Sequence, residues 1–447
     1  MTMNAKRRRI HDRLAALPGV RAVRRPVSPG SDERFDLFYV RTGRKSAQPV
    51  VLIPGGPGVA SVRPYRPLRR RAATAGFDVI MIEHRGVGMS RHTDAGADLP
   101  PAAITVEQVV DDIAAVLDDA GVHRAVIYGT SYGSYIAAGF GVRHPDRVAA
   151  MVLDSPLLST TDIEAIRSAV RGLLWEGNNP ETVELAPKVR RLVADGKLAT
   201  KGGELAGLLY GFGGAALLDR QLDLLLRGRT LVWSGLRRLS GLSARKAPYR
   251  NEVDLVGRIA FRELNYAGVP DGLPLDPALD MADMIGSAKF YEPFEAEPFD
   301  LTRELPQFHW PTVVVSGGRD LTTPPAIAER VAALVPGAVL VRMPTVAHSV
   351  LDTRERAAFA VIRAVYDGEL ERLSATATEL DALPARAVIQ RGGGGDLDGH
   401  RGGSGIAAPD RGLSSRLLHE PDLGEVRVGQ AEGPEIGQVA AYRDVAR

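Results

Sequence analysis

The sequence predicts an α/β fold: a mostly parallel β-sheet covered by helices on both faces and interrupted by a helical insertion. Short, uninterrupted apolar runs such as Val50–Ile53 alternate with helical segments, as is typical of strands buried on both faces. Residues 157–305 contain leucine-rich helical segments instead, without a convincing buried strand. In addition, the run Ala125–Tyr128 leads through Ser131 directly into an apolar helix.

Composition narrows the possible classes of protein. The 447 residues exceed the usual size of one domain, and 45 % are apolar and 25 % charged, as in an ordinary soluble protein. A net charge of +2 with only short arginine clusters argues against a nucleic-acid or membrane-surface partner. The chain has no cysteine, so disulfides, a thiolate nucleophile and cysteine-ligated metals are excluded. It also lacks a run of about 18 apolar residues and the apolar core of a secretion signal, so we expect a cytoplasmic protein without a membrane span.

The N-terminal part predicts an extension followed by the first strands. Residues 1–33 predict a short helix near Arg8–Leu17 and then irregular structure, because three prolines punctuate them. The aromatic-rich run Phe35–Arg41 predicts an edge strand, and Val50–Ile53 predicts a buried one. The buried strand runs into a glycine-proline loop at residues 54–58, where Gly56 is the expected backbone donor to an oxyanion. The alternative is a tight loop that only reverses the chain.

Ser131 is a candidate nucleophile because of its local context. Gly129 and Gly133 flank it at the two positions where a sharp strand-to-helix turn leaves no room for side chains. The alternative interpretation is an ordinary glycine turn. Because the residue after the nucleophile begins the helix, the backbone N–H of Tyr132 is the expected second oxyanion donor.

Two further candidates follow Ser131 along the chain. The strands predicted at Thr312–Ser316 and Ala338–Met343 are followed by Asp320 and His348, respectively. A serine hydroxyl needs an adjacent base, which would be His348, and Asp320 would hold the imidazole in the required tautomer. Asp154 also ends a predicted strand and is the rival acid, but we prefer Asp320 and interpret Asp154 as a turn-forming cap.

Five motifs together resemble the α/β-hydrolase superfamily, in which Ser, Asp and His follow one another in this order. They are Gly55–Gly58, Glu83–Ser90, Gly129–Gly133, Gly317–Asp320 and Ala347–Ser349. Within the superfamily, they are most similar to the proline iminopeptidase and tripeptidyl aminopeptidase group. This resemblance implies an exopeptidase that removes N-terminal residues without a metal or cofactor.

Two motifs depart from the pattern of that group. Pro54 stands where histidine is common, and Glu83 stands where aspartate is common. The group also binds the substrate's amino group through acids of its cap. The candidates here, none of which can be aligned to a cap motif, are Glu176, Glu181, Glu292, Glu295 and Glu297.

The expected organisation is an N-terminal extension (1–33), two parts of a hydrolase core (34–156 and 306–372), a helical cap (157–305) and a low-complexity, disordered tail (373–447). Three functions remain open: a serine aminopeptidase acting on small peptides, a serine esterase or amidase acting on small acyl compounds, and a non-catalytic ligand-binding protein of the same fold. The sequence does not predict the oligomeric state.

Overall fold

A computed structural model describes residues 3–198, 200–236, 248–279 and 292–385. Its centre is an eight-stranded sheet with the order β1-β2-β4-β3-β5-β6-β7-β8. The strands are β1 (Val20–Pro26), β2 (Arg34–Thr42), β3 (Val50–Ile53), β4 (Val79–Ile82), β5 (Ala125–Thr130), β6 (Val148–Asp154), β7 (Thr312–Gly317) and β8 (Val339–Met343). β3 to β8 are parallel, whereas β2 is antiparallel to both β1 and β4. The predicted mostly parallel sheet is therefore confirmed.

Helices cover both faces of this sheet, because alternate side chains of each strand point to opposite sides. Val51 and Ile127 pack in one core with α3 and α4, and Val50 and Val126 pack in the other with α2 and α15. The helices of the core are α1 (Ala5–Ala15), α2 (Arg66–Thr74), α3 (Val106–Asp119), α4 (Tyr132–Arg143), α12 (Leu301–Glu304), α13 (Pro325–Leu334), α14 (Val350–Thr353), α15 (Glu355–Asp367), α16 (Leu370–Ala375) and α17 (Ala377–Asp381). Short η segments lie at Gly88–Ser90, Pro101–Ala103, Pro145–Arg147 and Leu305–Gln307.

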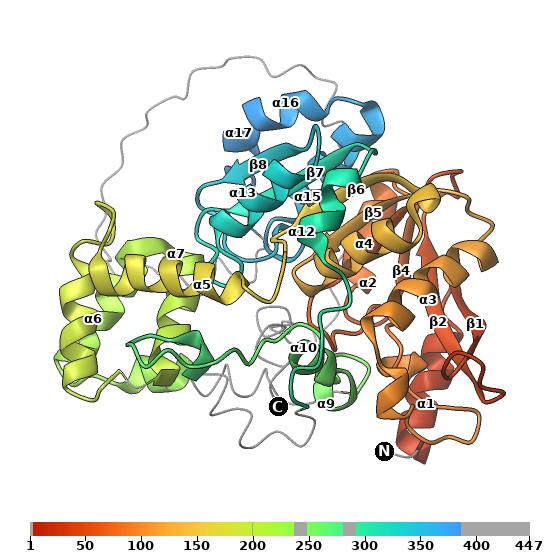
Figure 1. Cartoon of the computed structure of the whole chain (residues 1–447), viewed down its shortest axis with the longest axis horizontal. Helices are drawn as coiled ribbons and strands as arrows, with labels where there is room; N and C mark the ends of the chain where they lie inside the picture. Colours follow the sequence, from red (N-terminus) through yellow and green to blue (C-terminus); the bar gives the residue numbers. More distant parts are fainter. Residues whose placement is uncertain (1–2, 199, 237–247, 280–291, 386–447) are drawn as a thin grey trace, which may run out of the picture.

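The cap lies between β6 and β7 and is helical, as predicted. Its described elements are α5 (Asp162–Arg171), η4 (Gly172–Glu176), α6 (Leu185–Ala194), α7 (Thr200–Leu226), α9 (Val253–Val256) and α10 (Arg258–Arg262). Figure 1 shows α6 and α7 projecting to one side of the sheet, where they enclose a separate apolar core that includes Leu185 and Leu222. α7 kinks at Gly214, whose φ is 65°. A Cβ there would lie 2.9 Å from the Arg319 guanidinium, so the kink packs directly on the residue before Asp320.

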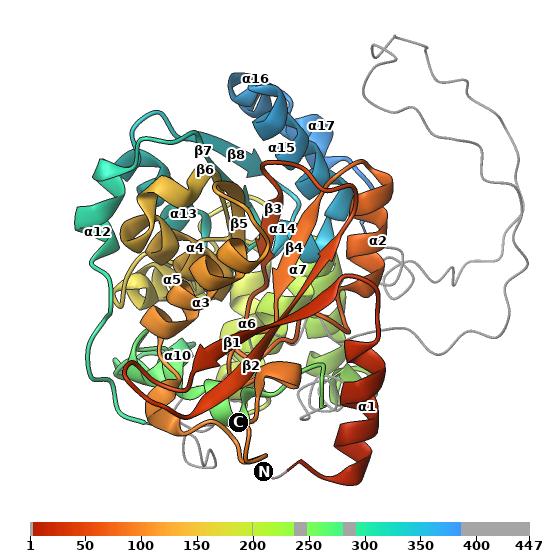
Figure 2. The same cartoon turned by 90° about the vertical axis from the view of Figure 1, so that its right-hand side faces the viewer.

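The two ends of the core differ from the sequence-based expectation. Residues 20–26 form β1, which pairs with β2 along its whole length, so Phe35–Arg41 is not an edge strand (Figure 2). β1 was not predicted because its three arginines and terminal proline obscure the weak alternation of apolar and polar side chains. At the other end, Leu373 of α16 and Leu380 of α17 are buried in the core, so the described fold extends past residue 372. The predicted disordered tail lies outside the described residues from residue 386 onward.

Candidate active site

Ser131 occupies a sharp turn between β5 and α4. Its φ of 53° and ψ of −127° lie outside the regions that a serine ordinarily adopts. The flanking glycines are required by contact, because a Cβ at Gly129 would lie 2.0 Å from the Gly133 carbonyl oxygen and one at Gly133 would lie 2.2 Å from the Ile53 carbonyl oxygen. The turn thus holds Ser131 at the carboxyl end of a central strand, against the end of β3.

Asp320 and His348 come from the loops after β7 and β8 and meet directly. His348 Nδ1 lies 2.8 Å from Asp320 Oδ2, and Asp320 is almost fully buried. The N–H groups of Thr322 and Thr323 donate to Asp320 Oδ1 over 2.8 and 2.9 Å, and Thr323 Oγ1 donates to Oδ2 over 3.0 Å. These bonds fix the carboxylate, which in turn orients the imidazole.

The surroundings of His348 favour its protonated form. Burial lowers the pKa of His348, but the charge and hydrogen bond of Asp320 raise it, with smaller contributions from Asp154 and Asp352, and the net shift is upward from 6.5. The side chain is 21 % exposed. Such a ring is well suited to accept a proton near neutral pH.

Asp154, the rival acid, is used differently. Its carboxylate accepts from the N–H groups of Val350 and Leu351 over 3.0 and 2.9 Å, at the start of α14, and from the Tyr128 hydroxyl over 3.0 Å. It therefore ties the end of β6 to the helix that follows His348. In addition, Thr130 Oγ1 donates a hydrogen bond to Ser349 Oγ over 2.9 Å. Thr130 precedes Ser131, and Ser349 follows His348. The structure therefore brings the serine turn and the histidine loop together.

The glycine-proline loop lies against Ser131. A Cβ at Gly55 would be 3.1 Å from Ser131 Cβ and 3.6 Å from Ser131 Oγ. Gly56 follows with a φ of 130°, which favours glycine, and Tyr132 is the first residue of α4. The backbone N–H groups of Gly56 and Tyr132 make no hydrogen bond with any other described group. Both N–H groups are thus unengaged within the described part of the chain.

His84 supports Tyr132 from the other side. Its Nδ1 lies 2.6 Å from the Arg85 carbonyl oxygen, which can only accept, so Nδ1 carries the proton and Nε2 accepts from the Tyr132 hydroxyl over 2.9 Å. Burial lowers the pKa of His84 to about 4, which keeps the ring neutral. Sequence reasoning gave His84 no role, since nothing local connects it with Tyr132.

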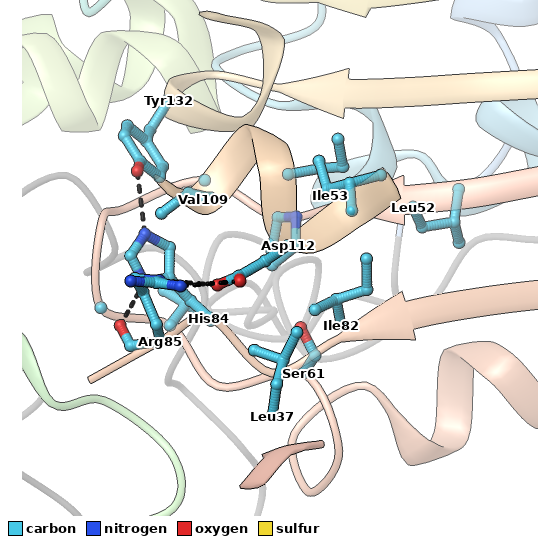
Figure 3. Close-up of a pocket in the computed structure, with 15 residues that line it drawn as sticks. Leu37, Leu52, Ile53, Ser61, Ile82, His84, Arg85, Val109, Asp112 and Tyr132 are labelled. Carbon is cyan, nitrogen blue, oxygen red and sulfur yellow. Dashed lines mark hydrogen bonds and ion pairs between the residues drawn. The ribbon is translucent and has the colours of Figure 1, made fainter. Parts of the chain in front are cut away.

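A cavity lies beside this pair (Figure 3). Gly55 and Tyr132 belong to its wall, and the remainder includes apolar side chains of β2, β3, β4 and α3 and residues of the glycine-proline loop. Figure 3 also shows Arg85 and Asp112 in its wall, joined as a buried ion pair with Nε–Oδ2 and Nη2–Oδ1 distances of 2.7 Å.

The candidate cap acids have different environments. Glu176, Glu181 and Glu295 are exposed. Glu292 is paired with Arg258 and Arg262. Glu297 is half-buried beside Tyr135 of α4, and burial raises its pKa to about 7. Its Oε1 is buried without a hydrogen-bonding partner among the described residues.

Sequence reasoning missed one further cap acid, Glu263, because nothing in the pattern separates it from a solvated helix end. It is buried, and it accepts from the Val106 N–H over 2.8 Å and from Arg262 over 2.6 Å. The pKa of Tyr132 is raised first by burial and then by the charge of Glu263.

Other kinds of site find no support in the described part of the chain. No group of three or more His, Asp and Glu side chains there is arranged to bind a metal ion. None of the described helices combines the length and apolar character needed to cross a membrane.

Comparisons with known proteins agree with this architecture. Residues 48–191 match the family model described as alpha/beta hydrolase fold. The chain is 24 % identical over 155 residues to a probable proline iminopeptidase of Streptomyces coelicolor, covering 34 % of this chain and 47 % of that protein. It is 27 % identical over 121 residues to a proline iminopeptidase of Neisseria meningitidis, covering 27 % and 36 %, and 33 % identical over 128 residues to a putative carbamate hydrolase of Azorhizobium caulinodans, covering 29 % and 43 %.

The matched segment thus spans less than half the length of each of these relatives. Among solved structures, a proline iminopeptidase of Mycobacterium smegmatis aligns with a TM-score of 0.46 and 16 % identity, covering 78 % of this chain and 99 % of that one. The family match at residues 48–191, together with the eight-stranded sheet and its helices, shows that this chain has the α/β-hydrolase fold.

Proposed function

We propose that this protein is a serine hydrolase of the aminopeptidase type. Ser131 is the nucleophile, His348 the general base and Asp320 the acid that orients the imidazole. The observation that carries the proposal is the 2.8 Å contact between His348 and Asp320, at a loop that the Thr130–Ser349 hydrogen bond fastens to the serine turn. The proline iminopeptidases among the relatives support it.

These proposed roles define the reaction. His348 Nε2 removes the proton of Ser131 Oγ as the oxygen attacks the substrate carbonyl, and the resulting oxyanion accepts hydrogen bonds from the N–H groups of Tyr132 and Gly56. Each such donor contributes about 3 kcal/mol to transition-state stabilisation. The imidazolium then passes its proton to the leaving amine, which departs and leaves an ester on Ser131. A water molecule, deprotonated by the same imidazole, hydrolyses this ester.

Glu297 supports a substrate with a free amino group. A half-buried carboxylate with one buried, unpartnered oxygen is costly to ionise, as its raised pKa reflects. An ammonium group would restore its charged form and form a charge-assisted hydrogen bond. Glu297 lies against Tyr135, one helical turn beyond Ser131, so this pairing would fix the amino terminus near the reacting carbonyl.

The test compares kcat/KM for a free and an N-acetylated prolyl or alanyl arylamide with the same leaving group. The free amine should be preferred by about 100-fold or more, since acetylation removes the charged hydrogen bond and adds bulk. Glu297→Gln should lower kcat/KM for the free amine by about 10- to 100-fold. The exposed Glu295, two residues away, is the matched control, and Glu295→Gln should leave the value unchanged. Equal values for the two arylamides would exclude the aminopeptidase.

A serine esterase is the second candidate. The mostly apolar wall of the cavity beside Gly55 and Tyr132 favours an uncharged acyl group. Short p-nitrophenyl esters assayed alongside the arylamides separate the two functions, because an esterase would prefer the esters and would not respond to Glu297→Gln.

A further inference from the structure

The glycine-proline loop at residues 54–58 leads into a segment that is anchored by the core. The N–H groups of Ser61 and Val62 donate to Glu83 Oε2 over 2.6 and 2.9 Å. The carbonyl oxygens of the same two residues accept from the buried Arg69 guanidinium over 2.5 and 2.7 Å. Glu83, where the related group commonly has aspartate, therefore holds the chain just beyond the loop.

The end of the loop is held by a distant segment. The Glu252 N–H donates to the Gly58 carbonyl over 2.9 Å, and the Ala60 N–H donates to the Arg250 carbonyl over 2.9 Å. Gly58 is tightly enclosed, because a Cβ there would lie 2.6 Å from a Val253 side-chain carbon. The chain two to four residues beyond Gly56 is thus held by residues 250–253, which belong to the cap and not to the sheet.

Arg7 of α1 fixes that cap segment. Its guanidinium binds both carboxylate oxygens of Glu252, with Nη1–Oε1 and Nη2–Oε2 distances of 2.5 and 3.0 Å. Nη2 also donates to the Gly88 carbonyl over 2.8 Å, while the Gly88 N–H donates to Glu252 Oε2 over 2.6 Å. The Tyr249 hydroxyl donates to the Arg7 carbonyl over 2.9 Å, and its ring lies 4.6 Å from the guanidinium.

Both members of this pair are buried, with 3 % of Arg7 and none of the Glu252 side chain exposed. A buried ion pair contributes little net stability, but loss of one partner leaves an uncompensated charge and is strongly destabilising. Arg91, 3.8 Å from Glu252, is already bound to Asp98 and Asp254 and is no substitute for Arg7. Without Arg7, Glu252 would move towards water and draw its backbone away from Gly58.

We propose that Arg7 is a positioning residue for the oxyanion donor Gly56. It acts through Glu252, whose backbone holds Gly58, and it touches no substrate. This inference rests on the serine hydrolase function proposed above. It also assigns a role to the N-terminal extension, which lies outside the segment matched by the family model.

The test uses a fluorophosphonate probe, which reacts with an activated serine and depends on the oxyanion donors but not on the substrate's identity. Arg7→Met should slow covalent labelling of Ser131 by tenfold or more, up to the roughly 100- to 1,000-fold that loss of one donor causes. The matched control is Arg8→Met on the exposed side of the same helix, which should label at the wild-type rate. With an arylamide substrate, Arg7→Met should lower kcat and leave KM nearly unchanged.

The double variant Arg7→Met/Glu252→Gln separates positioning from stability. Removing the uncompensated charge should return the melting temperature towards the wild-type value, while labelling stays slow because the bidentate anchor is absent. It also carries the test if Arg7→Met alone does not fold. Wild-type labelling rates in either the folded single variant or the double variant would overturn the role of Arg7. If the wild-type protein itself is not labelled, the proposed hydrolase function fails, and the role of Arg7 fails with it.

Discussion

Replacement of Asp320 by asparagine tests how the acid acts. Asparagine retains an acceptor for the N–H groups of Thr322 and Thr323, which bind Oδ1 in the native protein. At the Oδ2 position it places an amide donor against His348 Nδ1, where the native carboxylate accepts. The ring must then move its proton to Nε2, and Nε2 loses the lone pair needed to deprotonate Ser131.

The expected loss follows from this change of tautomer. In the serine-histidine-aspartate template the wrong tautomer costs about 10⁴-fold in kcat, or roughly 5.5 kcal/mol of transition-state stabilisation. The fold should lose only about 1 kcal/mol, equivalent to one hydrogen bond. We therefore expect Asp320→Asn to reduce kcat/KM by about three to four orders of magnitude, with little change in melting temperature.

Asp154→Asn is the matched comparison, since it makes the same chemical change in a second buried acid at a strand end. Its two oxygens accept from the N–H groups of Val350 and Leu351, so an amide must face one of these donors and leave it unsatisfied. This should cost about 1–3 kcal/mol of stability and have a smaller effect on kcat/KM than Asp320→Asn. The measurements are kcat/KM and thermal unfolding of both variants. A lower kcat/KM in Asp154→Asn than in Asp320→Asn would refute the assignment of Asp320 as the acid.

Three further predictions concern Ser131, His348 and His84. Ser131→Ala should abolish hydrolysis and fluorophosphonate labelling without unfolding the protein, as followed by activity and circular dichroism; residual activity above a few per cent would contradict the assignment. The acid limb of the pH profile of kcat/KM should lie above pH 6.5, because the pKa of His348 is raised and the protonated ring cannot accept the serine proton; Asp320→Asn should move this limb to lower pH. The folded-state pKa of His84 is depressed to about 4, so its contribution to stability is complete above pH 6.5 and is lost as pH falls towards 4. The free energy of unfolding should thus decline between these pH values by up to about 3 kcal/mol more in the wild type than in His84→Gln. Urea unfolding at a series of pH values measures this difference, and the same pH dependence in both proteins would argue against the burial effect.

The parts of the fold predictable from sequence are those encoded locally. Apolar runs marked the buried strands, and Gly129 and Gly133 marked the turn, because each reports on a steric requirement a few residues away. The proximity of Asp320 to His348 was predictable from topology, since the carboxyl ends of adjacent parallel strands lie at the same edge of a sheet.

The remainder depends on contacts between distant residues. Arg7 and Glu252 are 245 positions apart, and neither lies in a pattern that distinguishes it from a surface charge. The function of Glu83 was equally hidden, because its partners are backbone N–H groups that the sequence does not identify. β1 becomes recognisable as a strand only once β2 is present to pair with it.

The recovered strand β1 has a consequence for the behaviour of the protein at high concentration. Unpaired backbone N–H and C=O groups at the edges of a sheet can form hydrogen bonds with strands of other chains. Here β1 carries exposed arginines at positions 21 and 24 and ends at Pro26, which has no N–H to donate. At the opposite edge, Ser374 of α16 donates to the Leu340 carbonyl of β8, and Asp381 of α17 binds Thr345 just beyond that strand. Charge and proline at one edge and helices at the other thus oppose strand-by-strand aggregation.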